Sequence, residues 1–222
     1  MSNTKISFLA SNEPKVIDAS EKLKTKYGNC TLSEAAVIVA LGGDGFMLGT
    51  LHDNMNLGLP VYGMNFGTVG FLMNDFSNRG LIQRLSRAEE TIINPLSMTA
   101  KCLDGSTKTA LAINEVSLLR SSSQAAKLRI LIDGKERMQE LVCDGALVST
   151  PAGSTAYNYS SHGPILPINA DILALTAMAA YRPRRWRGAV LNSEANILFE
   201  TLETEKRQVS AVADSVEVEN VI

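Results

Sequence analysis

The chain has 222 residues, of which 45% are hydrophobic and 20% are charged, and its formal net charge is -2. This length accommodates one large or two small globular domains, and the slightly negative charge argues against a broad basic surface for nucleic acid. The three cysteines and two histidines are scattered along the chain, so they predict neither a disulfide framework nor a metal site. Because the chain has no long apolar run, we expect a cytoplasmic protein without a membrane partner.

The first part of the chain alternates between short apolar runs and helical patterns. Residues 36–41 form an uninterrupted apolar run, which is typical of a strand buried on both faces of a parallel sheet. The other expected elements are a strand at 6–10, a helix at 14–27, a crossover helix at 46–51 and a strand at 61–64. This alternation predicts an α/β domain over residues 1–94.

From residue 95 the pattern changes to strands joined by tight turns, which predicts a β-rich domain over residues 95–222. Asp104-Gly105 and Asp133-Gly134 each separate two strand-like runs, as in a β-hairpin. The expected strands are 97–103, the run that ends at 119, 128–132, the run that starts at 135, and 216–219. Because few helices are predicted to cover these strands, we expect the bare sheet faces and edges to form a homo-oligomer.

A Gly-Gly-Asp-Gly loop at residues 42–45 lies between the apolar run and the predicted crossover helix. Such a position favours an anion at the helix N-terminus, and glycines let a phosphate approach the main chain. Asp-Gly is also a common turn pair, but the flanking strand and helix favour a phosphate loop. An aspartate beside phosphates suits either a magnesium ion or proton transfer from a hydroxyl. Asp44 is therefore the candidate general base, and Gly43 and Gly45 are candidate phosphate contacts.

A second polar segment interrupts an apolar run. Asn114 and Glu115 lie within residues 110–118, which are otherwise mostly apolar. Strand alternation would let one of the two side chains face inward and the other outward. Both can accept hydrogen bonds from ribose hydroxyls, although a polar pair at a strand end is the simpler explanation when these residues are taken alone.

The third segment, residues 143–157, is the longest. It contains a strand end, a turn forced by Pro151 and Gly153, and a short helix from about residue 156 that Ser154 or Thr155 can cap. Small residues at such a turn admit a flat ring or a phosphate. An ordinary capped helix fits the local pattern equally well.

Together these segments resemble the NAD kinase family, whose members carry a Gly-Gly-Asp-Gly loop, an Asn-Glu pair and a Thr-Pro-x-Gly-Ser-Thr-Ala-Tyr segment in this order. The corresponding residues here are 42–45, 114–115 and 150–157, and the stretches 63–72 and 163–165 are also similar. The resemblance extends from about residue 36 to residue 220. It departs at Asp214-Ser215-Val216, where the family usually has Asp-Gly-Gln.

The resemblance implies an N-terminal α/β domain, a C-terminal β-rich domain and an active site between them. The implied reaction transfers the γ-phosphoryl group of ATP, or a phosphoryl group of polyphosphate, to the 2′-hydroxyl of the adenosine ribose of NAD, which makes NADP. A divalent cation, Mg²⁺, would accompany ATP, Asp44 would be the base, and Phe71 would pack near the adenine. The residues that would hold NAD are Asn114, Glu115, Asp144, Ala152, Thr155, Ala156, Tyr157, Asn158, Tyr159 and Ser160. Family members assemble as dimers or tetramers, which also implies a homo-oligomer.

Two other functions fit part of the sequence. A lipid or sphingoid-base kinase would share the Gly-Gly-Asp-Gly loop, but no basic amphipathic helix for a membrane surface stands out. A non-catalytic dinucleotide sensor would gain little from a carboxylate at Asp44 beside phosphates. The one basic cluster, Arg182, Arg184, Arg185 and Arg187 around Trp186, could bind phosphate or RNA, but we expect it at a surface or subunit contact.

Overall fold

The computed structural model describes residues 4–67 and 70–222. Thr68 and Val69, which belong to the stretch that resembles the NAD kinase family at 63–72, lie outside the described residues. The chain divides into two compact units, Met1–Glu90 and Thr91–Ile222, and each is described by itself. No helix in the described part of the chain is long and apolar enough to cross a membrane.

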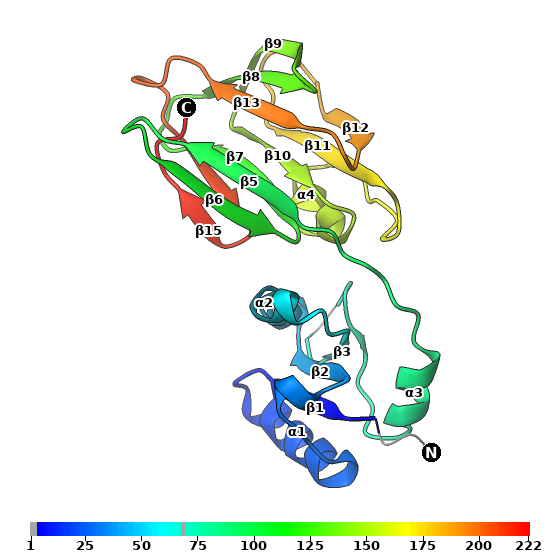
Figure 1. The fold of residues 1–222 in the computed structure, drawn as a ribbon. Coiled ribbons are helices and arrows are strands. Elements are labelled where there is room, and N and C mark those ends of the chain that lie inside the picture. Colours follow the sequence, from blue (N-terminus) through cyan, green and yellow to red (C-terminus); the bar gives the residue numbers. More distant parts are fainter. Residues whose placement is uncertain (1–3, 68–69) are drawn as a thin grey trace. The chain divides into compact units, whose positions relative to one another are not determined.

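The N-terminal unit is an α/β domain built on a four-stranded parallel sheet in the order β1-β2-β3-β4, as predicted. Its strands and α-helices are β1 (Ile6–Ala10), α1 (Pro14–Tyr27), β2 (Val37–Gly42), α2 (Asp44–Asn54), β3 (Val61–Asn65), β4 (Asn74–Asp75) and α3 (Leu81–Arg87). Two short 3-10 turns lie at Leu32–Glu34 and Met55–Leu57. The colours of Figure 1 follow this order along the chain from blue to green.

Burial explains why these elements form where the apolar pattern predicts them. All six residues of β2 are buried, as expected of a central strand in a parallel sheet that is covered on both faces. The helix α1 buries Val16, Ala19 and Leu23, which are spaced by three and four residues and so lie on one face. The predicted crossover helix is longer than expected, because α2 begins at Asp44 itself.

The C-terminal unit is β-rich, which confirms the second half of the predicted fold class (Figure 1). A six-stranded antiparallel sheet has the order β12-β11-β10-β7-β14-β15, and smaller sheets have the orders β13-β8-β9 and β5-β6. The strands are β5 (Leu96–Lys101), β6 (Thr107–Ala112), β7 (Glu115–Arg120), β8 (Ala126–Ile132), β9 (Lys135–Cys143), β10 (Gly145–Ser149), β11 (Ile172–Met178), β12 (Gly188–Asn192), β13 (Ile197–Thr201), β14 (Val209–Ala213) and β15 (Val216–Val218).

One hydrophobic core joins the three sheets of this unit. It contains Leu128 and Leu141 from the three-stranded sheet, Val148 and Leu175 from the six-stranded sheet, and Met98 from the β5–β6 hairpin. The only helical segments described in this unit are the 3-10 turn Ala152–Thr155 and α4 (Tyr157–Ser160), which follow β10 directly. They therefore begin at the same end of the sheet as Ser149.

The structure corrects two predictions in this region. The run that ends at 119 is not one strand, because β6 ends at Ala112 and β7 begins at Glu115, so the chain passes from the small hairpin sheet into the large sheet at Ile113 and Asn114. The expected helix after residue 156 is present, but neither Ser154 nor Thr155 caps it through a side chain. The Ser154 hydroxyl instead donates to the carbonyl of Pro151 at 2.7 Å.

Candidate functional site

The first group of predicted site residues lies where β2 ends and α2 begins. Gly42 is buried, and a Cβ at this position would lie 2.7 Å from the Cβ of Phe46, so only glycine lets the first turn of α2 fold over the strand end. A Cβ on Gly43 or Gly45 would meet no atom of the described residues within 4 Å. The main chain at these two glycines therefore faces open space at a helix N-terminus, which suits the approach of a phosphate.

Asp44 holds a second segment of the same unit to this loop. Its carboxylate accepts hydrogen bonds from the backbone N–H of Phe71 at 2.8 Å and of Leu72 at 3.2 Å. The Phe71 side chain remains 63% exposed, so it is available to contact a ligand ring. The structure thus brings Asp44 and Phe71 together, although they are 27 residues apart in the sequence.

The second group lies in the C-terminal unit, where the Asn-Glu pair meets the turn after β10. Glu115 pairs with Ser149 at the end of β10. The backbone N–H of Thr150 donates to the carbonyl of Asn114 at 2.9 Å, and the Thr150 hydroxyl donates to the carbonyl of Ile113 at 2.6 Å. Two motifs that were separate in the sequence therefore form one structure.

Gly153 makes this contact possible. A Cβ on Gly153 would clash with the carbonyl of Asn114 and would lie 2.5 Å from its Cα. The turn that starts at Pro151 can therefore rest on the Asn114 backbone only if a glycine occupies this position. The backbone N–H of Gly153 also donates to the Thr150 hydroxyl at 3.1 Å, which closes the turn.

Asn114 and Glu115 present acceptor atoms that the described residues leave unsatisfied. Asn114 Oδ1 and Glu115 Oε2 are buried, and no described group donates a hydrogen bond to either. The pKa of Glu115 is raised to about 7, chiefly by burial and also by the negative charge of Asp214, while the backbone N–H of Tyr157 acts in the opposite direction. Buried acceptors without donors are costly, so this pair is suited to a ligand that supplies hydroxyl groups.

The residues of the short helical segment divide into a buried and an exposed set. Asn158 is fully buried. Its amide donates to the carbonyls of Ser154 at 3.1 Å and Pro164 at 2.8 Å, and it accepts from the Thr176 hydroxyl at 2.6 Å. Asn158 therefore stabilises the segment through buried hydrogen bonds. Ala152 is also buried, Thr155 and Ala156 are half-buried, and Tyr157, Tyr159 and Ser160 are exposed.

Asp144 is the predicted binding residue that the structure does not bring to this group. It precedes β10, where Gly145 pairs with Leu119, whereas Glu115 pairs with Ser149 at the other end of the same two strands. Its carboxylate accepts a hydrogen bond from Arg120 Nε at 2.6 Å. At about 3.3 Å per residue along a strand, Asp144 lies roughly 16 Å from Glu115.

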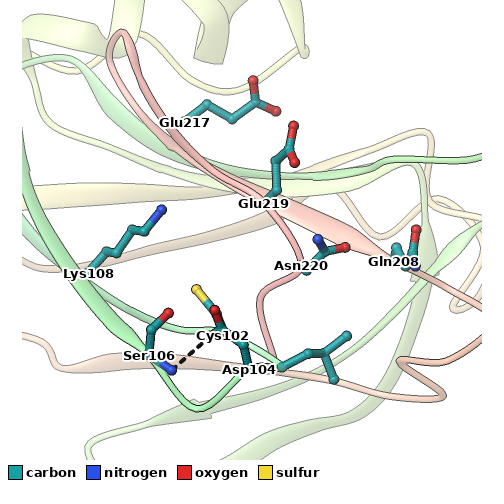
Figure 2. Close-up of a pocket in the computed structure, with 9 residues that line it drawn as sticks. Cys102, Asp104, Ser106, Lys108, Gln208, Glu217, Glu219 and Asn220 are labelled. Carbon is teal, nitrogen blue, oxygen red and sulfur yellow. Dashed lines mark hydrogen bonds between the residues drawn. The ribbon is translucent and has the colours of Figure 1, made fainter.

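A polar cavity of about 630 Å³ lies elsewhere in this unit (Figure 2). Its lining residues are Cys102, Leu103, Asp104, Ser106, Lys108, Gln208, Glu217, Glu219 and Asn220. None of the predicted site residues is among them. The cavity is therefore separate from the Asn114–Glu115 site.

Sequence reasoning missed Asp214 as part of the site. The carboxylate of Asp214 accepts hydrogen bonds from the backbone N–H groups of Ile113, Asn114 and Glu115 at 2.6, 2.9 and 3.2 Å. An aspartate opposite a polar pair about 100 residues away leaves no local pattern. Its only signal in the sequence was that it stands where the family usually has the aspartate of Asp-Gly-Gln, although the next two residues differ.

The comparisons with known proteins match both units of the chain. Models of the ATP-NAD kinase N-terminal and C-terminal domains match residues 3–90 and 113–221. A curated NAD kinase of Cereibacter sphaeroides is 59% identical over 222 residues, which is 100% of this chain and 87% of the relative. A curated NAD kinase of Caulobacter vibrioides is 57% identical over 215 residues, which is 97% of this chain and 83% of the relative.

Two solved structures share the fold. Yeast NADH kinase complexed with NADH has a TM-score of 0.81 at 20% identity, covering 99% of this chain and 77% of that chain. The NAD kinase from Archaeoglobus fulgidus in complex with ATP has a TM-score of 0.74 at 24% identity, covering 96% of this chain and 86% of that chain. The family models and the curated relatives show that the chain belongs to the NAD kinase family.

Proposed function

We propose that the chain transfers the γ-phosphoryl group of ATP to the 2′-hydroxyl of the adenosine ribose of NAD and so makes NADP. The observation that carries the proposal is the pair of buried acceptors, Asn114 Oδ1 and Glu115 Oε2, to which no described residue donates. A ribose presents neighbouring hydroxyl donors that satisfy such a pair. The relatives named NAD kinase at 53–59% identity support this substrate.

Asp44 is the group that we propose accepts the proton from the attacking hydroxyl. The ribose O2′ forms a bond to the γ-phosphorus, the bond between this phosphorus and the bridging β–γ oxygen breaks, and ADP leaves. The hydroxyl proton passes to the Asp44 carboxylate. In the structure each oxygen of this carboxylate accepts one backbone N–H, and a carboxylate oxygen has a further lone pair with which to accept the proton.

The triphosphate of ATP is proposed to bind at the glycine loop with a magnesium ion. No group of three His, Cys, Asp or Glu side chains that could hold a metal occurs in residues 4–67 and 70–222. Mg²⁺ is commonly bound through one or two carboxylates, substrate phosphates and water, and Asp44 is the carboxylate at this loop that fits such an arrangement. When bound, the ion would neutralise charge on the phosphates.

The test of this function is an incubation with ATP, MgCl₂ and NAD, followed by detection of NADP with an NADP-specific dehydrogenase. Formation of NADP at catalytic turnover supports the proposal. A sphingoid base or diacylglycerol in place of NAD tests the lipid-kinase alternative, and polyphosphate in place of ATP tests the second donor. Binding of NAD without any NADP would instead support a sensor.

We further propose that the active protein is a homo-oligomer in which a second copy completes the NAD site. Asp144 and Glu115 lie at opposite ends of the β7–β10 pair, so one ribose cannot touch both residues of one chain. Close to Asp144, Tyr181 is 57% exposed and donates its backbone N–H to the carbonyl of Val142. The exposed Arg182, Arg184, Arg185 and Arg187 and the half-buried Trp186 follow directly, and arginine and aromatic residues are enriched at interfaces.

Mixing of two inactive variants tests the shared site. In a dimer of Asp44→Asn with Asp144→Asn, one shared site carries both changes and the other carries neither. Random pairing of equal amounts should therefore restore about a quarter of the wild-type activity. If Asp44 and Asp144 act within one chain, the mixture recovers no activity. The three free cysteines further support our proposal of a reducing, cytoplasmic location.

A further inference from the structure

The turn between β14 and β15 directs a carboxylate at the main chain that carries Asn114 and Glu115. Asp214 Oδ2 accepts the backbone N–H of Ile113 at 2.6 Å, and Oδ1 accepts those of Asn114 at 2.9 Å and Glu115 at 3.2 Å. In return, the backbone N–H of Asp214 donates to the carbonyl of Glu115 at 3.1 Å. The two segments are therefore joined from both sides.

These hydrogen bonds hold a segment of the chain that is not held by regular strand pairing. Ile113 and Asn114 lie between β6 and β7, which belong to different sheets, so their N–H groups have no regular ladder partner. Hydrogen bonds to a charged acceptor are roughly twice as strong as neutral ones. Asp214 has a positive φ of 49°, a conformation that aspartate tolerates better than most residues, and this turn directs its side chain back to the segment.

We propose that Asp214 is a positioning residue that fixes Asn114 and Glu115 in the orientation in which they bind the nucleotide. This inference rests on the proposed NAD-binding role of those two residues. Asp214 acts through the hydrogen bonds that its carboxylate accepts from the backbone N–H groups of these residues. The buried acceptors Asn114 Oδ1 and Glu115 Oε2 keep a defined position only while this backbone is held.

Asp214 also sets the electrostatic surroundings of Glu115. Burial is the largest cause of the raised pKa of Glu115, and among the described residues Asp214 is the charged group whose field raises that pKa as well. On the neighbouring strand, Glu115 faces the uncharged Ser149, and from α4 the backbone N–H of Tyr157 lowers the pKa. Loss of the Asp214 charge should therefore make Glu115 ionise at a lower pH.

The experiment compares Asp214→Asn with Asp133→Asn. Asparagine keeps one oxygen acceptor and the shape of the side chain, but it loses the charge and the second oxygen. Asp133 is a matched control because it also has a positive φ, of 52°, and its Oδ1 accepts the backbone N–H of Asn196 at 2.9 Å in a different turn. NAD and ATP are titrated separately into each protein by calorimetry between pH 5.5 and about 8.5.

For Asp214→Asn we expect the Kd for NAD to rise about tenfold, the size of a lost hydrogen bond to a charged group. The Kd for ATP should stay within about twofold, and the pH midpoint of NAD binding should fall by about one unit because the like charge is gone. Asp133→Asn should leave all three quantities unchanged. A purely structural role would weaken NAD and ATP binding together without moving the midpoint, and that result would overturn the inference.

If Asp214→Asn fails to fold, Asp214→Glu restores the charge on a longer side chain. It should fold, keep the pH midpoint and still weaken NAD binding, whereas wild-type NAD affinity in Asp214→Glu would contradict a positioning role. The inference and the proposed function fail in different ways. If the wild type makes no NADP, the function is wrong. If Glu115→Gln weakens NAD binding but Asp214→Asn does not, only the inference is wrong.

Discussion

The carboxylate of Asp44 accepts a hydrogen bond from the backbone N–H of Phe71 at 2.8 Å. This bond joins the first turn of α2 to the segment after β3, and the neighbouring N–H of Leu72 reinforces it at 3.2 Å. The side chain that we propose as the base is therefore held in place by two main-chain groups before a substrate arrives. Such preorganisation is what a base needs to act on a hydroxyl in one orientation.

Asp44→Asn should abolish most of the activity and keep the fold. Loss of a general base typically lowers the rate by about 10²–10⁴, while the amide oxygen of asparagine can still accept one of the two backbone N–H groups. The measurements are kcat for NADP formation and the melting temperature. Asp75→Asn, at an exposed position of β4, is the control and should behave like wild type. Turnover by Asp44→Asn within a few-fold of wild type would show that Asp44 is not the base.

Asn114→Ala and Glu115→Gln should weaken the binding of NAD more than that of ATP. Each change removes one of the acceptor groups that we assign to the ribose hydroxyls, and the loss of such a hydrogen bond corresponds to about 1–2 kcal/mol, or roughly five- to thirtyfold in Kd. Separate titrations with NAD and with ATP give the two values. A selective loss of ATP binding would reverse the assignment of the two substrates to their sites.

Gly153→Ala should disturb the site that contains Asn114 and Glu115 by displacing the backbone of Asn114. The added methyl group would clash with the backbone of Asn114, so we expect destabilisation by about 1–3 kcal/mol together with weaker NAD binding. Gly49→Ala is the matched control, because a Cβ at Gly49 in α2 meets no atom of the described residues within 4 Å and alanine favours a helix by up to about 1 kcal/mol. Chemical denaturation of both variants measures the difference, and equal stability would contradict the close packing of Gly153.

The stability of the protein should depend on the ionisation of Glu115. Its pKa in the folded protein is about 7 against an ordinary value of 4.5. The folded state therefore holds the proton more tightly, and the stabilisation is fully present below pH 4.5 and is lost as the pH rises through 7. Because the carboxyl is partly open to solvent, we expect a contribution of about 1–2 kcal/mol.

Glu115→Gln should remove this dependence. At pH 8.5 the uncharged variant should be more stable than wild type by about 1–2 kcal/mol, and at pH 4 the two proteins should be nearly equal in stability. Denaturant titrations across this pH range test the prediction. A variant whose stability curve runs parallel to that of the wild type would show that Glu115 titrates normally.

The oligomer that we propose should depend on the loop between β11 and β12. Trp186 packs partly against the core of the C-terminal unit, while the arginines around it are exposed. Trp186→Ala should therefore shift the protein towards smaller species, and activity should fall with the fraction of oligomer. Light scattering coupled to size exclusion, repeated across dilutions, measures both. A fully active monomer of the 23.9 kDa chain mass would refute the oligomer.

The sequence predicted those elements whose determinants lie within a few residues of each other. The apolar run before Gly42 predicted a strand buried on both faces, and the glycines beyond it predicted the turn into α2, because burial and glycine geometry act within a few residues. The first bond of the site, from Phe71 to Asp44, was not predictable in this way. It depends on how the segment after β3 returns to α2, and no local pattern encodes that path.

The segment around Asn114 is a second region that local sequence patterns did not predict correctly. Its apolar alternation continues across residues 110–118 and predicted a single strand, yet the chain changes sheets at Ile113. At this point the carboxylate of Asp214 accepts hydrogen bonds from the backbone N–H groups of Ile113, Asn114 and Glu115. A partner about 100 residues away can override local propensity without any signal in the segment that it reshapes.

The position of the transferred phosphate tests the central claim most directly. NAD is incubated with ATP, MgCl₂ and the wild-type protein, and the purified product is examined by ³¹P–¹H correlation NMR. We predict a new phosphorus coupled to the 2′ proton of the adenosine ribose, with a parallel reaction by Asp44→Asn giving almost none of it. No phosphorylated dinucleotide from the wild-type protein, or a phosphate on any other hydroxyl, would contradict the account.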